Sequence, residues 1–195
     1  MNTPVQILEK YWGFSSFNST QEAIIESVLN GQDTIALLPT GGGKSICFQI
    51  PAMLRKGICI VISPLVALMH DQVNNLNSKG IKSMALTSGF SHSDLDRMLD
   101  NCIFGNYKFL YLSPERLQQD LVQQRIKQMN VNLIAVDEAH CISQWGHDFR
   151  PAYRDIKLLR KIHPTVNVIG LTASATSKVV DDISDQLDCI SPKIF

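Results

Sequence analysis

The sequence predicts an α/β protein with a mainly parallel sheet and helices on both faces. Short β-branched runs alternate with longer segments of helical period, which is the order that repeated strand–helix–strand units produce. Several of these runs are apolar throughout, as strands covered by helices on both faces should be. Three consecutive glycines follow the first run, where a tight connection to a helix is expected.

Six strands are expected, each of about the usual length, at 34–38, 58–63, 83–86, 109–112, 133–136 and 166–171. Between them, the periodicity predicts helices over 20–29, 44–54, 66–76, 91–104, 115–128, 152–162 and 176–187. The 195 residues contain no internal repeat, low-complexity segment or linker. This organisation is typical of one domain.

Composition excludes several classes of protein. Hydrophobic residues make up 45% of the chain and charged residues 18%, which excludes a disordered chain. Lys and Arg balance Asp and Glu at 18 each, so only a local basic strip could attract nucleic acid. No apolar run reaches the ~20 residues of a membrane span, and the N-terminus lacks a secretion signal. We therefore expect a cytoplasmic protein without membrane contact, and we interpret its five scattered cysteines as reduced and mostly buried.

The segment LLPTGGGKS, from Leu37 to Ser45, joins the first strand to the next helix. Its glycines let the backbone N–H groups curl around a polyphosphate at the helix N-terminus. In this interpretation Lys44 reaches the β- and γ-phosphates and Ser45 places its hydroxyl on Mg²⁺. Leu38 replaces the leading glycine of the general pattern, and a chance glycine-rich turn is the alternative. The predicted nucleotide-binding residues here are Thr40, Gly41, Gly42, Gly43, Lys44 and Ser45.

An acidic pair ends the strand in LIAVDEAH, from Leu133 to His140. Such a strand delivers carboxylates to the carboxyl edge of the sheet, where ligands of parallel sheets bind. Asp137 is then placed to hold Mg²⁺ through water, and Glu138 to orient and deprotonate an attacking water. The alternative is an acidic pair that only caps a surface strand. With Lys44, these two residues form the predicted catalytic set.

PTGGGKS together with DEAH resembles the superfamily 2 helicases, and DEAHCISQWGHDFRP resembles the RecQ DNA helicases. The segments YWGFSSFNSTQ, SPLVALMHDQ, YLSPERL and LTASAT extend the resemblance over nearly the whole chain. It implies that residues 1–195 form the first of two RecA-like lobes of a P-loop motor, with residues 1–30 reading adenine. The implied activity is ATP- and Mg²⁺-dependent 3′ to 5′ unwinding in DNA repair and recombination. Implied partners are single-stranded and duplex-junction DNA and the second lobe, with a place at the nucleoid if the protein is bacterial.

The resemblance assigns adenine binding to Gln21, whose amide can pair with the N6/N7 edge, and stacking to Phe14. Asn18, also assigned to the nucleotide site, replaces an arginine of the family pattern, so we expect the base to be held less tightly than in the family or by different contacts. A purely structural role at the helix entry is the alternative for these residues. His140, Thr172 and Ser174 are implied to lie near the γ-phosphate and to transmit its loss, although the two hydroxyl residues could simply cap a helix.

The stretch that follows the acidic pair offers flat faces for unstacked bases in Trp145, His147 and Phe149, and a guanidinium in Arg150. The resemblance implies that this aromatic loop reports DNA to the ATP site. Ordinary core aromatics are the alternative. By resemblance, Ser63, Gln72 and Ser113 also contact single-stranded DNA. Four basic residues, spaced as on one helical face, could follow a DNA backbone or form a solvated surface: Arg150, Arg154, Lys157 and Lys161.

Two other functions fit parts of the sequence. A stand-alone P-loop ATPase or nucleotide switch would explain the glycine loop but not the aromatic loop. A non-enzymatic DNA-binding module would leave Lys44, Asp137 and Glu138 without a purpose. The sequence also offers no obvious arginine to neutralise charge on the γ-phosphate, which the resemblance assigns to the second lobe.

Overall fold

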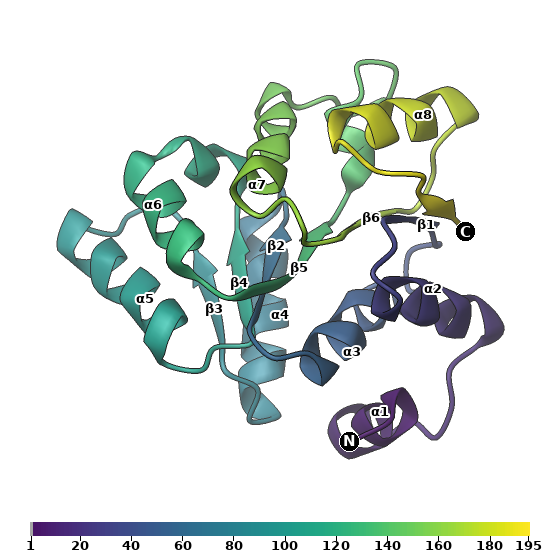
Figure 1. The fold of residues 1–195 in the computed structure, drawn as a ribbon, viewed down its shortest axis with the longest axis horizontal. Helices are drawn as coiled ribbons and strands as arrows, with labels where there is room; N and C mark the ends of the chain where they lie inside the picture. The colour runs from purple at the N-terminus through teal and green to yellow at the C-terminus, as the bar shows by residue number, and fades with distance from the viewer. Residues whose placement is uncertain (1) are drawn as a thin grey trace.

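The computed structural model describes residues 2–195, in which seven strands form one entirely parallel sheet. Its order is β3-β4-β2-β5-β6-β1-β7 (Figure 1). The strands are β1 (Thr34–Leu37), β2 (Ile58–Ile62), β3 (Ser83–Leu86), β4 (Phe109–Leu112), β5 (Val131–Val136), β6 (Val168–Thr172) and β7 (Lys193–Ile194). The expected α/β class is confirmed. The short edge strand β7 was not predicted.

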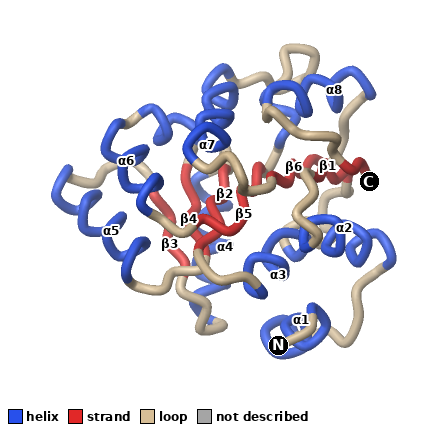
Figure 2. Tube along the Cα trace, in the orientation of Figure 1, coloured by secondary structure: helices blue, strands red, loops and turns tan. Residues whose placement is uncertain are grey.

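Helices cover both faces of the sheet, as predicted (Figures 1 and 2). One face packs against α2 (Ser19–Leu29), α3 (Ile46–Leu54) and α4 (Val66–Ser78). The other packs against α5 (His92–Phe104), α6 (Asp120–Gln128), α7 (Lys157–Ile162) and α8 (Ser177–Gln186). The strands between them are buried along nearly their full length, which explains their unbroken apolar runs.

A helix that the sequence analysis did not predict, α1 (Pro4–Trp12), packs against α3. Its first turn carries a capping box, because Thr3 Oγ1 accepts from the Gln6 backbone N–H while Gln6 Oε1 accepts from that of Thr3. Pro4 supplies a preset φ at the first position, and Gly13 ends the helix at φ +74°.

Two predicted helices break into shorter pieces. The expected helix at 115–128 is a 3₁₀ segment, Pro114–Gln118, followed by α6. The expected helix at 152–162 is a 3₁₀ segment, Pro151–Ile156, followed by α7. The second break corrects the expected basic stripe, because Arg150 and Arg154 precede the α-helix and do not share one α-helical face with Lys157 and Lys161.

The strand order brings the predicted site residues to one edge. Strand β6 lies between β1, which precedes the glycine loop, and β5, which precedes the acidic pair. Since all strands run parallel, their carboxyl ends meet at the same edge, where ligands of such sheets bind.

A buried ion pair fixes the opposite edge. Asp33 accepts from Arg160 Nη2 at 2.8 Å and from the backbone N–H groups of Val168 and Ile190. These bonds join β1 to α7, to β6 and to the chain before β7. The sheet is therefore anchored at its amino edge, away from the site.

The five cysteines are free, and four of them are buried, as expected. Burial raises the pKa of the Cys141 thiol to about 12. Among the residues described here, no helix combines the length and the apolar character that a membrane crossing requires.

Candidate ATP site and aromatic loop

A cleft of about 530 Å³ opens at the carboxyl edge of the sheet, a volume suited to a small ligand. The predicted residues Thr40, Gly41, Gly43, Lys44, Ser45, Asp137 and Glu138 all line it. Trp12, Gln49, Asp71 and Gln72 line the other walls.

The glycine loop adopts a conformation that other residues would resist. Gly41 and Gly43 have φ values of +80° and +72°, in the left-handed region. A Cβ on Gly42 would lie 2.9 Å from the Pro39 carbonyl oxygen, and one on Gly43 would collide with the Gln21 amide. The loop thus keeps its backbone open to a ligand at the N-terminus of α3.

Leu38, which stands where the general pattern has glycine, is buried in the core on the side of α2 and α3. Its backbone N–H donates to the Thr172 carbonyl at 3.0 Å, so it extends the pairing of β1 with β6. The replacement of glycine by Leu38 therefore affects the strand extension that supports the glycine loop. It does not change the conformation of the three glycines.

A chain of polar contacts runs across the edge of three strands. Lys44 Nζ lies 3.5 Å from Glu138 Oε1, and Glu138 Oε2 lies 3.4 Å from His140 Nδ1. The same His140 nitrogen is 2.8 Å from Thr172 Oγ1, which donates to the Ser174 carbonyl. Burial lowers the pKa of His140 and so favours its neutral ring, while the nearby Glu138 charge opposes this shift. The glycine loop, the acidic pair and the end of β6 are connected through this histidine.

Burial of charge and backbone strain both destabilise the acidic pair, Asp137 and Glu138. Asp137 is only 7% exposed, and burial followed by the nearby Glu138 charge raises the pKa of its carboxyl group. Lys44 and the Glu138 backbone N–H, which donates to Asp137 Oδ1 at 2.9 Å, oppose this shift. Glu138 itself has φ +49°, a strained value for a residue with a side chain. Buried charge and backbone strain at one place are typical of functional sites.

The residues fit a nucleotide with Mg²⁺. Ser45 makes no capping hydrogen bond with its hydroxyl, and Asp137 faces the same cleft. A hydroxyl and a carboxylate are hard oxygen ligands, and Mg²⁺ is commonly held by one or two such groups with water and phosphate oxygens. Lys44 supplies the positive charge beside them.

The predicted adenine segment contacts the glycine loop through one side chain. Gln21 Nε2 donates to the Gly42 carbonyl at 3.2 Å, and Gln21 Oε1 accepts from the Asn18 backbone N–H at 3.2 Å. A side-chain amide has two donors and two acceptor positions, so one of each remains for a base. Asn18 caps α2 by accepting from the Gln21 backbone N–H at 2.8 Å. Phe14 is 57% exposed, whereas Trp12, which was given no role, lines the cleft.

The aromatic loop, residues 143–150, is mostly exposed. Trp145 is 63% exposed, and Lys178 Nζ of α8 lies 3.2 Å from the centre of its ring. The Arg154 guanidinium lies over Phe149 at 5.2 Å. His147 stacks on His140 with ring centres 5.0 Å apart. The loop therefore touches the ATP-site histidine and otherwise keeps aromatic surface available.

The C-terminal end of this loop is tied to residues 137–142, called here the acidic segment. The Arg150 backbone N–H donates to the Cys141 carbonyl at 2.8 Å. The Tyr153 hydroxyl, fully buried just beyond the loop, donates to the Asp137 carbonyl at 3.1 Å. Arg150 Nη1 reaches the Pro64 carbonyl at 3.3 Å, which lies after β2. A movement of this end of the loop would therefore be transmitted to the backbone of Asp137 through the Tyr153 hydrogen bond.

The remaining predicted DNA residues differ in exposure. Ser63 is 1% exposed, and its hydroxyl lacks a hydrogen-bond partner within residues 2–195. Gln72 is half-buried and accepts from the Tyr111 hydroxyl at 2.8 Å. Ser113 is half-buried at the end of β4. Thr172 is fully buried and Ser174 is exposed, so only the latter is open to a ligand in this structure.

The model of the DEAD/DEAH box helicase family matches residues 18–183. The chain belongs to this family. Among curated relatives, it is 46% identical over 184 residues to a probable ATP-dependent DNA helicase RecS of Bacillus subtilis, covering 94% of this chain and 37% of that protein. It is 46% identical over 183 residues to the ATP-dependent DNA helicase RecQ of the same organism, covering 93% of this chain and 31% of that protein. The resemblance to RecQ helicases is confirmed, and the chain spans about a third of the length of these relatives.

Solved structures show the same fold. The helicase domain of Pyrococcus furiosus Hef superposes with a TM-score of 0.68 at 24% identity, covering 90% of this chain and 37% of that one. A hypothetical ATP-dependent RNA helicase from Sulfolobus tokodaii gives 0.71 at 17% identity, covering all of this chain and 57% of that one. The expected RecA-like lobe is confirmed at the level of the fold.

Sequence reasoning missed several residues of this DEAD/DEAH box domain. Lys178 and Tyr153 contact the aromatic loop and the acidic segment from outside the quoted motifs. Gln49 donates to Tyr111, which in turn donates to Gln72, and this closes the wall of the cleft. A buried Tyr whose polar tip needs a partner is a general signal for such links, but only the fold shows which partner it finds.

Proposed function

We propose that this chain is the N-terminal, ATP-binding lobe of a RecQ-like helicase that translocates 3′ to 5′ on single-stranded DNA and unwinds duplexes. The observation that supports it most is the double attachment of the aromatic loop to the acidic segment. Tyr153 bonds the Asp137 carbonyl, and His147 stacks on His140. A stand-alone ATPase would have no use for exposed aromatic residues joined to its catalytic carboxylates.

In this proposal the glycine loop and Lys44 bind the phosphates, while Gln21 reads adenine with its remaining donor and acceptor. Ser45 and Asp137 hold Mg²⁺, which neutralises charge on the phosphate oxygens when it is bound. Glu138 orients the attacking water and accepts its proton. Bases stack on Trp145 and Phe149, and Arg150 adds a cation at the same place.

The proposal requires a second lobe to complete the site. Among the residues described, no arginine lines the cleft, and Arg150 instead bonds the Pro64 carbonyl. An arginine that reaches the γ-phosphate from the opposite side contributes about 10³ to 10⁵ in rate in comparable motors. We place that arginine, and the closing and opening that drives translocation, in the part of the protein that would face this cleft.

The test compares ATP hydrolysis by the 195-residue chain with hydrolysis by a longer protein that also contains a second lobe. Single-stranded DNA should stimulate the longer protein, while the chain alone should bind ATP but hydrolyse it slower by about 10³-fold or more. Duplex unwinding should be seen only in the longer protein. Equal DNA-stimulated rates would show that the lobe carries its own arginine or self-associates. Hydrolysis without any response to DNA would favour a nucleotide switch.

A further inference from the structure

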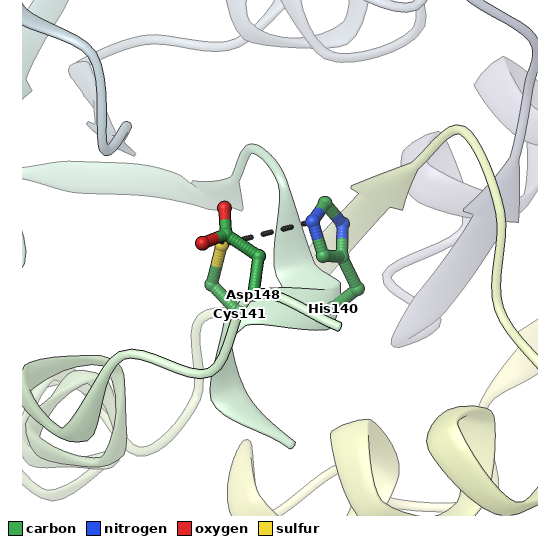
Figure 3. Close-up of side chains that lie close together, drawn as sticks. All are labelled: His140, Cys141 and Asp148. Atoms are coloured by element: carbon green, nitrogen blue, oxygen red, sulfur yellow. Dashed lines mark hydrogen bonds between the residues drawn. The ribbon is translucent and has the colours of Figure 1, made fainter. Parts of the chain in front are cut away.

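Three potential metal ligands meet beside the ATP site, on residues that the ATP chemistry does not use in this way. One ring nitrogen of His140, Cys141 Sγ and a carboxylate oxygen of Asp148 all lie within 4.8 Å of one another (Figure 3). The sulfur is 3.8 Å from the histidine nitrogen and 3.8 Å from Asp148 Oδ2. His140 and Cys141 are buried, whereas Asp148 is exposed and leaves a path from solvent.

The neighbours of His140 leave its Nε2 free to bind a metal. Thr172 Oγ1, 2.8 Å from His140 Nδ1, accepts from this nitrogen when its own proton is donated to the Ser174 carbonyl. Glu138, the other neighbour of Nδ1, also accepts. These two acceptors favour a ring proton on Nδ1, which leaves Nε2, 3.8 Å from Cys141 Sγ, available as a ligand. A histidine ligand held by a hydrogen bond from its other nitrogen is the usual arrangement in metal sites.

The spacing suits a tetrahedral ion. Zinc binds sulfur at about 2.3 Å, and nitrogen and oxygen at about 2.0 to 2.2 Å, which places donor atoms roughly 3.4 to 3.6 Å apart. The two separations from Cys141 Sγ, 3.8 Å each, exceed this range by only a few tenths of an ångström, and the separation between His140 and Asp148 is within 4.8 Å. Asp148 can make the larger adjustment, because it is exposed in the loop.

We propose that His140, Cys141 and Asp148 form a Zn²⁺ site with three protein ligands and one open position. Metal binding displaces the proton of the Cys141 thiol, whose pKa burial raises, and releases it to solvent. The resulting thiolate, with imidazole, selects Zn²⁺ over Mg²⁺, which prefers oxygen. The ligands come from the acidic segment and from the aromatic loop, so a bound ion joins the loop to the ATP-site histidine. Zinc binding needs neither ATP nor DNA. The test of the zinc site is therefore independent of the test of the proposed function.

The experiment titrates the 195-residue chain with Co²⁺ as a spectroscopic probe, in the presence of excess Mg²⁺ and without nucleotide. A thiolate-to-cobalt charge-transfer band with tetrahedral visible bands is expected, and one equivalent of Zn²⁺ should abolish both. Cys141→Ser should remove the charge-transfer band. Asp148→Asn, at an exposed position that does not threaten folding, should weaken Zn²⁺ binding by at least about tenfold, the usual scale of a disturbed metal site.

Cys189→Ser is the matched control, since it removes a half-buried thiol elsewhere and should bind as the unchanged chain does. Hydrogen exchange should slow in residues 143–150 when Zn²⁺ is added, but not in Asp148→Asn. Unchanged affinity in Asp148→Asn, or loss of the charge-transfer band in Cys189→Ser, would overturn the site.

Discussion

Residues 137–142 and residues 143–150 follow one another in the chain, yet they are held by different kinds of contact. The first group is buried, apart from the partly exposed Glu138, and its side chains are bonded to the glycine loop and to β6. The second projects Trp145, His147 and Asp148 into solvent, and its aromatic rings contact cations and another ring, while hydrogen bonds hold Arg150 at its end. Residues 137–142 are therefore fixed before a ligand binds. Residues 143–150 can still change conformation when a ligand binds.

Under the proposed function, this difference lets one segment bind two ligands. A site that stabilises charge must be rigid, because fixed dipoles and charges need no reorganisation during the reaction. A surface that accepts single-stranded bases can be looser, since stacking tolerates any base. The Tyr153 hydroxyl and the His147 ring connect the rigid half to the loose one. Mutations in the first half should therefore cost far more than those in the second.

The largest effect is expected for Glu138→Gln in a protein that contains both lobes. The amide keeps the shape of the side chain but cannot take a proton from water, and general-base catalysis is worth about 10² to 10⁴ in rate. The ATP hydrolysis rate should fall by that factor while nucleotide binding persists. Glu115→Gln, on the exposed 3₁₀ segment after β4, is the control and should leave the rate unchanged. A loss of less than tenfold would remove Glu138 from the role of base.

Lys44→Ala should weaken binding of ATP with Mg²⁺ to the 195-residue chain. Hydrogen bonds to charged groups contribute about 1.5 to 3 kcal/mol, which corresponds to roughly 10- to 150-fold in affinity. Lys56→Ala, at the opposite edge of the sheet, should bind as the unchanged chain does. Titration with a fluorescent ATP analogue measures both variants, and equal affinities would refute the phosphate assignment.

The features that the sequence predicted well are local ones. Unbroken apolar runs located six strands, and the three glycines marked the turn before α3. Helix α1 was missed although Thr3, Pro4 and Gln6 carry a recognisable start signal. The basic stripe was wrong because Pro151 begins a 3₁₀ segment, and residue spacing alone cannot distinguish it from an α-helix. Contacts such as Lys178 with Trp145 depend on how α8 packs beside the loop, which no local pattern encodes.

Trp145→Ala should reduce the stimulation of hydrolysis by single-stranded DNA while basal hydrolysis continues. Loss of one stacked base costs about 1 to 3 kcal/mol, so DNA affinity should fall roughly 5- to 150-fold. Phe104→Ala removes an even more exposed aromatic residue, at the end of α5, and is the matched control. Anisotropy of labelled DNA and coupled ATPase assays report the two quantities. Stimulation that survives Trp145→Ala would make the loop purely structural.

The smallest effect concerns the cation on Trp145. An exposed cation–π contact is worth about 0.5 to 1 kcal/mol. Lys178→Ala should therefore lower the population of the conformation in which the Trp145 ring is fixed in place by only about 2- to 5-fold. The chain has two tryptophans, and Trp12→Phe leaves Trp145 as the only one, which can be excited selectively at wavelengths that tyrosine does not absorb. In that background, Lys178→Ala should increase acrylamide quenching and lower fluorescence anisotropy. Lys178→Arg keeps a cation and should preserve both values. Identical quenching in all three proteins would mean that backbone hydrogen bonds of the loop, and not this cation, hold Trp145. Residues 137–142 and 143–150 would then be equally rigid.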